Sequence, residues 1–217
     1  MDATTNMNLE DARREYLRSG LNRENLQRDP IQQFKSWMAQ AVEHQLTDAT
    51  AMTLATVSEN GCPSQRTVLL KQIDEDGFIF FTNLESKKAQ DIINNNQVSI
   101  HFSWLQLERQ VKIQGVAEKL STAKALKYFL TRPRDSQLAA WSSTQSKVIG
   151  SRQLLEQKFA EMKHKFSQGE VPLPSFWGGY KISPKQIEFW QGRGKRLHDR
   201  FQYCKQADSW KINRLAP

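Results

Sequence analysis

Cationic side chains inside structured segments are the residues of this chain best suited to chemistry. Arg66 and Lys71 bracket the run TVLL, which predicts two charges at the ends of a strand whose middle lies in a core. The run ESKKA predicts Lys87 and Lys88 in the first turn of a helix, where cations oppose the helix dipole unless an anion lies nearby. The first arrangement suits an anion and the second a phosphate group, and an ordinary solvated strand end or helix end would explain the same patterns.

A second candidate cluster lies in the run KYFLTRPRDSQ. Tyr128, Arg132 and Ser136 follow one another at a spacing of four, which is one face of a helix, although Pro133 must interrupt the backbone ladder between them. The cluster suits an anionic ligand, and a helix end with surface charge is the alternative.

A third cluster is the run RLHDR, in which Arg196, His198 and Arg200 alternate and are expected on one face of an extended strand. Three such side chains repel one another unless an anion or a planar π-system lies against them. A barrel that binds single-stranded nucleic acid would show the same pattern, with Trp190 and Trp210 as stacking platforms.

Other common signatures of catalysis are missing from the sequence. It contains no glycine-rich phosphate loop, no dinucleotide-binding fingerprint and no His/Cys spacing suited to zinc, so no metal is predicted. The four histidines stand apart, and neither cysteine has a neighbouring histidine. If the chain is an enzyme, something other than these motifs must supply the reactivity.

Composition places these clusters in a basic globular protein. The 217 residues are 38% hydrophobic and 25% charged, with a net charge of +8. Residues 180–217 hold nine Lys/Arg against three acids, which concentrates the positive charge there. Two cysteines, Cys62 and Cys204, and the lack of a leader or a long apolar run predict a cytoplasmic protein without a membrane segment.

The elements that must position the clusters follow from periodicity and caps. Residues 1–20 are predicted to form a mobile N-terminal arm, with a short docked helix over 9–20. Further helices are predicted after Asp29-Pro30, with Ile31 and Phe34 inward, and after Ser86, with Ala89, Ile92 and Ile93 inward. Two more follow Ser121 and Ser151, the last with an apolar side formed by Leu154, Leu155, Phe159, Met162 and Phe166.

Strand-like runs fill most of the remaining chain. They lie at 51–57, 64–73, 78–83, 98–104, 109–120, 180–192, 197–205 and 209–217. Short strands with a few helices predict a mainly β, α+β fold, a closed or nearly closed antiparallel barrel with covering helices. A single domain over 1–217 is the simplest interpretation.

Taken together, these segments resemble the pyridoxamine 5′-phosphate oxidase family nearly end to end. The motifs that carry the resemblance are RREY at 13–16, QRTVLLK at 65–71, FFTN at 80–83, SKKA at 86–89, ERQV at 108–111, TRPRDSQ at 131–137, PSFWGG at 174–179, QIEFWQG at 186–192, RLHDR at 196–200 and the terminal RLAP. Lys87 stands where the family often has arginine.

The resemblance implies an FMN-binding split-barrel homodimer with FMN at the subunit interface and with dimerisation and active-site strands in 174–217. It implies these FMN-binding residues: Arg66, Thr67, Val68, Leu69, Leu70, Lys71, Phe81, Thr82, Lys87, Lys88, Gln110, Gln145, Ser146, Trp190 and Arg200. It implies that Lys71, Tyr128, Arg132 and Ser136 hold the substrate phosphate, that the catalytic residues Arg196 and His198 lie over the substrate ring, and that Arg13 and Tyr16 close on it.

The implied reaction is oxidation of pyridoxamine or pyridoxine 5′-phosphate to pyridoxal 5′-phosphate, with hydride transfer from C4′ to flavin N5 and reduction of O2 to H2O2. Scattered cations suit this reaction because two phosphate monoesters must be bound. The nucleic-acid-binding barrel and a split-barrel flavoprotein with another substrate are the alternatives.

Overall fold

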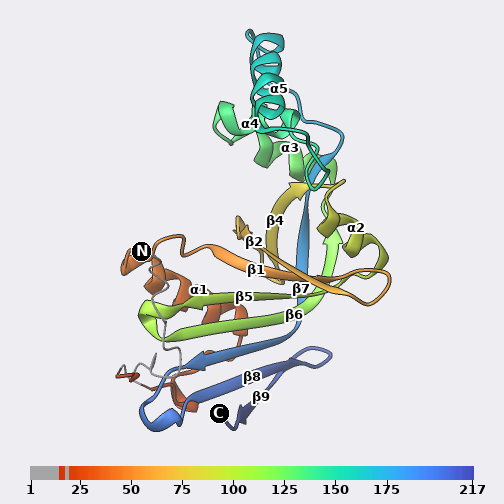
Figure 1. Cartoon of the computed structure of the whole chain (residues 1–217). Helices are drawn as coiled ribbons and strands as arrows, with labels where there is room; N and C mark the ends of the chain where they lie inside the picture. The colour runs from red at the N-terminus through yellow and green to blue at the C-terminus, as the bar shows by residue number, and fades with distance from the viewer. Residues whose placement is uncertain (1–14, 18–19) are drawn as a thin grey trace, which may run out of the picture.

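The computed structural model describes residues 15–17 and 20–217, which form one curled antiparallel sheet with helices around it (Figure 1). Within this part of the chain nine strands join in the order β2-β1-β5-β6-β7-β4-β3, while β8 pairs with β7 and β9 with β8. The strands are β1 (Ala51–Val57), β2 (Pro63–Leu69), β3 (Gln72–Ile73), β4 (Phe78–Asn83), β5 (Gln97–Trp104), β6 (Arg109–Lys119), β7 (Trp177–Gln191), β8 (Asp199–Lys205) and β9 (Trp210–Leu215). The predicted fold class is confirmed.

Strand β7 connects the two ends of the molecule. Its first residues pair with β4, with Trp177 opposite Asn83, and its last residues pair with β8, with Gln191 opposite Asp199. Strand β6 pairs with β7 from Arg109, opposite Gln191, to Lys119, opposite Tyr180. In Figure 1, β7 runs from the helical lobe down to the C-terminal strands. Trp177 and Trp190 therefore lie near opposite ends of a single strand.

Helix α1 (Pro30–Glu43) covers the barrel core, as its cap and period predict. The Asp29 carboxylate accepts a hydrogen bond from the Ile31 amide at 2.9 Å, and proline occupies the first helical position. The Phe34 ring packs edge-on at 4.9 Å from the ring centroids of both Phe78 and Phe102. The helix thus seals one side of the barrel with aromatic contacts.

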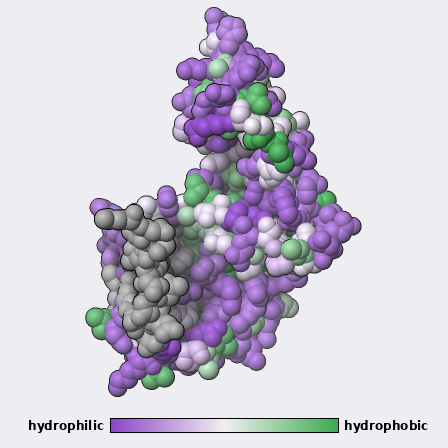
Figure 2. Space-filling model, in the orientation of Figure 1, coloured by the Kyte–Doolittle hydropathy of each residue, from purple (hydrophilic) through white to green (hydrophobic). Residues whose placement is uncertain are grey.

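Helices α3 (Thr122–Leu130), α4 (Arg134–Ser142) and α5 (Arg152–Lys165) project from the sheet as a helical lobe (Figure 1). The lobe has a small core of its own, formed by Phe129, Leu138, Val171 and Trp177. The predicted apolar side of α5 packs only in part, because Leu154 and Leu155 are exposed and no residue of α5 is fully buried. Figure 2 shows the lobe as a mainly hydrophilic surface with a few hydrophobic patches.

Several local predictions need correction. The helix predicted over 9–20 falls mostly outside the described residues, and residues 15–17 and 20 are not helical. Helix α2 (Lys87–Asn94) forms with Ala89 and Ile92 buried as expected, but Ile93 is 66% exposed because the buried face is made by Lys88, Ala89, Asp91 and Ile92. No helix in the described part of the chain is long and apolar enough to cross a membrane.

Candidate active site

A cavity of about 560 Å³ lies where the helical lobe meets the sheet, a size typical of small-molecule sites. Figure 2 shows the surface indented between lobe and body. The cavity is lined by Arg66, Thr67, Val68, Leu69, Lys71, Phe81, Thr82, Asn83, Lys88, Tyr128, Arg132, Ala139, Ala140, Ser143, Gln145 and Trp177. Four of these described lining residues are cationic and none is a carboxylate, so the cavity suits an anionic ligand.

Lys88 forms the first anchoring point for an anion. Its Nζ donates hydrogen bonds to Gln145 Oε1 at 2.7 Å, Thr82 Oγ1 at 3.2 Å and Ser86 Oγ at 3.2 Å, all of which are neutral oxygens. Burial and, to a smaller extent, the charge of Arg66 lower the pKa of Lys88 to about 8. An ammonium held this way gains most from a bound anion.

Arg132 forms a second anchoring point. Its guanidinium carbon lies 4.9 Å from the Trp177 ring centroid, and its Nη1 is buried without a hydrogen-bond partner among the described residues. Beside it the Tyr128 ring stacks on Phe81 with centroids 3.9 Å apart. Burial raises the pKa of Tyr128 despite the opposing charge of Arg132, so its hydroxyl stays a neutral donor. Buried polar groups normally have partners, and a ligand anion would satisfy this nitrogen.

Three of the predicted FMN-binding residues lie elsewhere in the protomer. Gln110, Trp190 and Arg200 line a cavity of about 260 Å³ on the β5–β8 face, together with His101. A cavity of about 310 Å³ shares Thr67 with the first cavity and His101 with this one. The three cavities are therefore neighbours along one sheet, but the implied FMN residues of one chain do not meet in a single pocket.

Arg200 is held in place by a buried acid. Glu188 Oε1 lies 2.8 Å from Arg200 Nε, and Glu188 Oε2 lies 2.9 Å from Lys112 Nζ. Burial alone would raise the pKa of Glu188, but the hydrogen bonds and charges of Arg200 and Lys112 lower it. Arg200 Nη1 also donates to the Ala216 carbonyl at 2.8 Å. These contacts pair the buried Glu188 carboxylate with two cations and fix the Arg200 side chain.

The extended strand predicted through Arg196 and His198 is wrong. Because Gln191 pairs with Asp199, residues 192–198 form the connection between β7 and β8, and a 3-10 turn covers Gly194–Arg196. Arg196 is exposed with φ +59°, a left-handed backbone that is costly for a residue with a side chain. Arg196 and Arg200 thus do not alternate on one strand face.

His198 lies in an aromatic group with Trp190 and Tyr16. Its ring centroid is 4.6 Å from Trp190 and 5.4 Å from Tyr16, and its Nδ1 accepts a hydrogen bond from the Arg193 amide at 3.1 Å. Tyr16 packs on Gly192, where an added Cβ would lie 2.6 Å from the tyrosine ring. The described part of the N-terminal segment therefore reaches the loop that carries His198. Arg13, its predicted partner, is outside the described residues.

The remaining predicted residues take other places. Leu70 belongs to the barrel core, Lys87 pairs with Asp91 at 2.9 Å, and neither Ser136 nor Ser146 lines the cavity. Strand β2 is an edge strand in which no residue is fully buried. The expectation that TVLL forms core therefore holds only in part: Leu70 belongs to the core, Val68 is half-buried against it, and Leu69 is exposed.

Several residues that line the 560 Å³ cavity were not predicted from the sequence. Asn83 and Trp177 could have been predicted, because they lie in the motifs FFTN at 80–83 and PSFWGG at 174–179. Ala139, Ala140 and Ser143 carried no chemical signal of their own.

Comparison with known proteins identifies the class to which this fold and site belong. Residues 38–166 match the family described as pyridoxamine 5′-phosphate oxidase, and residues 177–217 match the pyridoxine 5′-phosphate oxidase C-terminal dimerisation region. The chain belongs to the pyridoxamine 5′-phosphate oxidase family.

Individual relatives agree with this membership. A pyridoxine/pyridoxamine 5′-phosphate oxidase of Teredinibacter turnerae is 62% identical, covering 97% of this chain and all of the relative. A Vibrio cholerae protein of the same description is 56% identical, covering 97% of this chain and all of the relative. The structure of PhzG from Burkholderia lata, in complex with tetrahydrophenazine-1-carboxylic acid, is 28% identical with a TM-score of 0.85, covering 89% of this chain and 95% of that one.

Family membership confirms three predictions: the split-barrel class, an oxidoreductase, and FMN as the cofactor. It also favours the enzyme over the nucleic-acid-binding barrel. The match to a dimerisation region supports a homodimer. The described residues fit FMN, because the Lys88 ammonium has only neutral partners and the unpartnered Arg132 nitrogen leaves room for a second anion.

Proposed function

We propose that this chain oxidises pyridoxamine 5′-phosphate and pyridoxine 5′-phosphate to pyridoxal 5′-phosphate. The amine reaction consumes O2 and water and yields ammonia and H2O2, and the alcohol reaction consumes O2 and yields H2O2. The observation that carries the proposal is the buried, unpartnered Arg132 nitrogen in a cavity wall that holds four cations and no described carboxylate. This wall suits two phosphate groups, one from the cofactor and one from the substrate.

Each part of the site then has a role. Arg66 and Lys88 would hold the FMN phosphate, and Lys71, Tyr128 and Arg132 the substrate phosphate. Bound FMN would supply the redox chemistry, accepting the hydride from substrate C4′ at N5 and reducing dioxygen. Arg196 and His198 would contact the substrate ring, with Tyr16 covering the loop from the N-terminal side.

We further propose that the flavin lies between two subunits. Gln110, Trp190 and Arg200 line a cavity separate from that of Arg66 and Lys88, so a flavin touching both groups is best explained by contributions from two chains. A dimer would bring the cavity of Gln110, Trp190 and Arg200 in one protomer to the phosphate-binding cavity of its partner.

An oxygen-consumption assay tests the proposed activity. The purified flavoprotein is expected to consume O2 with pyridoxamine 5′-phosphate and to form pyridoxal 5′-phosphate, with much lower kcat/KM for pyridoxamine, which lacks the phosphate. Equal rates with both substrates, or none with either, would instead favour a flavoprotein for another substrate. The PhzG complex makes a carboxylate-bearing heterocycle the first alternative to assay.

The pH dependence of FMN binding is expected to follow Lys88. Its pKa is about 8, and only the ammonium form attracts the phosphate, so FMN affinity should fall as pH rises through that value. The fall should approach about tenfold per pH unit, the limit for one proton. Flavin fluorescence titrations of the flavin-free chain between about pH 7 and pH 9.5 measure it.

Two comparisons isolate the lysine. Riboflavin binding should vary much less over the same range, since riboflavin has no phosphate. Lys88→Arg should flatten the FMN profile, because a guanidinium keeps its charge throughout. An FMN profile that stays flat in the wild-type chain would show that Lys88 does not contact the phosphate.

A further inference from the structure

We propose that Thr56 and Asp91 are positioning residues that orient the Arg66 guanidinium toward the flavin phosphate, and so set the preference of this chain for FMN over riboflavin. The inference rests on the proposed function, because it takes Arg66 as a phosphate ligand. Neither Thr56 nor Asp91 lines the 560 Å³ cavity, so neither can touch the flavin there.

Protein oxygens accept three of the five N–H groups of the Arg66 guanidinium. Its Nη1 donates to the Leu54 carbonyl at 3.1 Å and to Thr56 Oγ1 at 2.7 Å, and its Nη2 donates to Ser64 Oγ at 2.7 Å. A guanidinium has five N–H groups, so these described contacts leave two of them, one on Nε and one on Nη2, for an anion. Two donors at fixed angles are what a bidentate phosphate contact requires.

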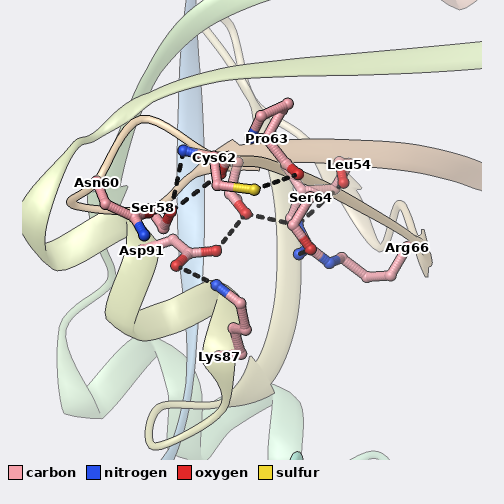
Figure 3. Close-up of polar contacts among 10 residues, drawn as sticks. Leu54, Ser58, Asn60, Cys62, Pro63, Ser64, Arg66, Lys87 and Asp91 are labelled. Atoms are coloured by element: carbon pink, nitrogen blue, oxygen red, sulfur yellow. Dashed lines mark hydrogen bonds and ion pairs between the residues drawn. The ribbon is translucent and has the colours of Figure 1, made fainter.

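Thr56 links the buried Asp91 carboxylate to the Arg66 guanidinium through its hydroxyl. Its hydroxyl accepts from Arg66 and donates to Asp91 Oδ2 at 2.7 Å. Figure 3 shows the labelled Arg66 and Asp91, with the Lys87 side chain directed at the Asp91 carboxylate. Thr56 is fully buried on β1, and Asp91 is 4% exposed on α2. Because the carboxylate can only accept, the hydroxyl proton points to Asp91 and the oxygen lone pairs point to Arg66. The hydroxyl therefore has one orientation, which fixes Nη1.

Lys87 keeps the acid from repelling the phosphate. Its Nζ lies 2.9 Å from Asp91 Oδ1, so the two side chains form a neutral pair behind Arg66. Burial alone would raise the pKa of Asp91, but hydrogen bonds from Lys87 and Thr56 and the charges of Lys87 and Arg66 lower it, which keeps Asp91 ionised. In this arrangement Lys87 acts through Asp91 and does not contact FMN directly, in contrast to the role that the resemblance implies.

Thr56→Val tests the relay, since valine matches threonine in shape and lacks the hydroxyl. FMN and riboflavin dissociation constants would be measured by flavin fluorescence on the full chain after flavin removal. We expect the preference for FMN over riboflavin to fall by roughly tenfold or more in Thr56→Val, tenfold being about 1.4 kcal/mol. Thr56→Ser restores the hydroxyl and should restore the preference.

Each outcome separates positioning from a merely structural role. Equal weakening of both flavins, or an unchanged preference in Thr56→Val, would overturn the inference. If Thr56→Val does not fold, Asp91→Asn replaces it: loss of FMN preference supports positioning, and a gain shows that Asp91 only offsets positive charge. A wild-type chain without preference for FMN would instead refute the proposed function itself, which makes the two failures distinguishable.

Discussion

Replacing Arg132 by alanine is expected to raise the KM for pyridoxamine 5′-phosphate by roughly 10- to 150-fold, with little change in FMN content. A hydrogen bond to a charged group contributes about 1.5–3 kcal/mol, which corresponds to this range. The contact would be made with a phosphate that does not react, so ground state and transition state lose it alike and kcat should change little.

The structure makes Arg132 a clean target. Its Nη1 has no described partner, so the substitution breaks no protein hydrogen bond at that atom. The substitution also removes the described contacts with the Trp177 and Phe129 rings, and Arg132→Met keeps an apolar stem against them. Both variants should show the same KM, and the exposed Lys127→Ala on α3 provides a control expected to match wild type.

Steady-state kinetics with two substrates decide the assignment. The KM for pyridoxamine 5′-phosphate should rise in both Arg132 variants, whereas kcat/KM for pyridoxamine, which has no phosphate, should stay at its low wild-type value. A normal KM would place the substrate phosphate elsewhere. Loss of flavin would move Arg132 to the cofactor site.

Substitutions at Arg196 are expected to separate activity from stability. Arg196→Lys keeps the charge but removes the plane that can stack on the substrate ring, so kcat/KM should fall by roughly tenfold or more, tenfold being about 1.4 kcal/mol. Flavin should remain bound, because Arg196 lines neither the cavity of Arg66 and Lys88 nor that of Trp190.

Arg196→Gly should lose more activity without losing stability. Glycine removes the cost of the left-handed backbone, which stabilises the fold by about 1–2 kcal/mol. Glycine also makes the unfolded chain more flexible, which destabilises the fold by about 0.4–1 kcal/mol. The free energy of unfolding should therefore stay level or rise slightly. Lys195 has φ +56° and is the matched control, since Lys195→Gly brings the same backbone relief next to the proposed contact. Lys195→Gly should keep activity.

The free energy of unfolding from denaturant titrations and kcat/KM from steady-state kinetics would be measured on these three variants. Full activity in Arg196→Lys would show that Arg196 acts only through its charge and does not need to stack on the substrate ring. A matching loss of activity in Lys195→Gly would show that the backbone of the loop, and not the guanidinium, supports catalysis.

The sequence by itself determined the elements whose signals are local. Helix α1 follows from Asp29, Pro30 and an apolar period within one segment, and the strands follow from runs of β-branched and aromatic residues. Ten short motifs spread along the whole chain also indicated the family and its cofactor, because together they are specific although each alone would be weak.

Only the tertiary structure decided which charges work together. Lys88 contacts Gln145, which lies 57 residues away, and Thr56 contacts Asp91 across 35 residues, and no local spacing encodes either pair. Adjacent lysines diverge for the same reason: helix α2 turns Lys88 into the cavity and Lys87 onto Asp91. The RLHDR run alternates in sequence, yet the pairing of Gln191 with Asp199 leaves Arg196 in a left-handed turn, because strand register is set by the partner strand.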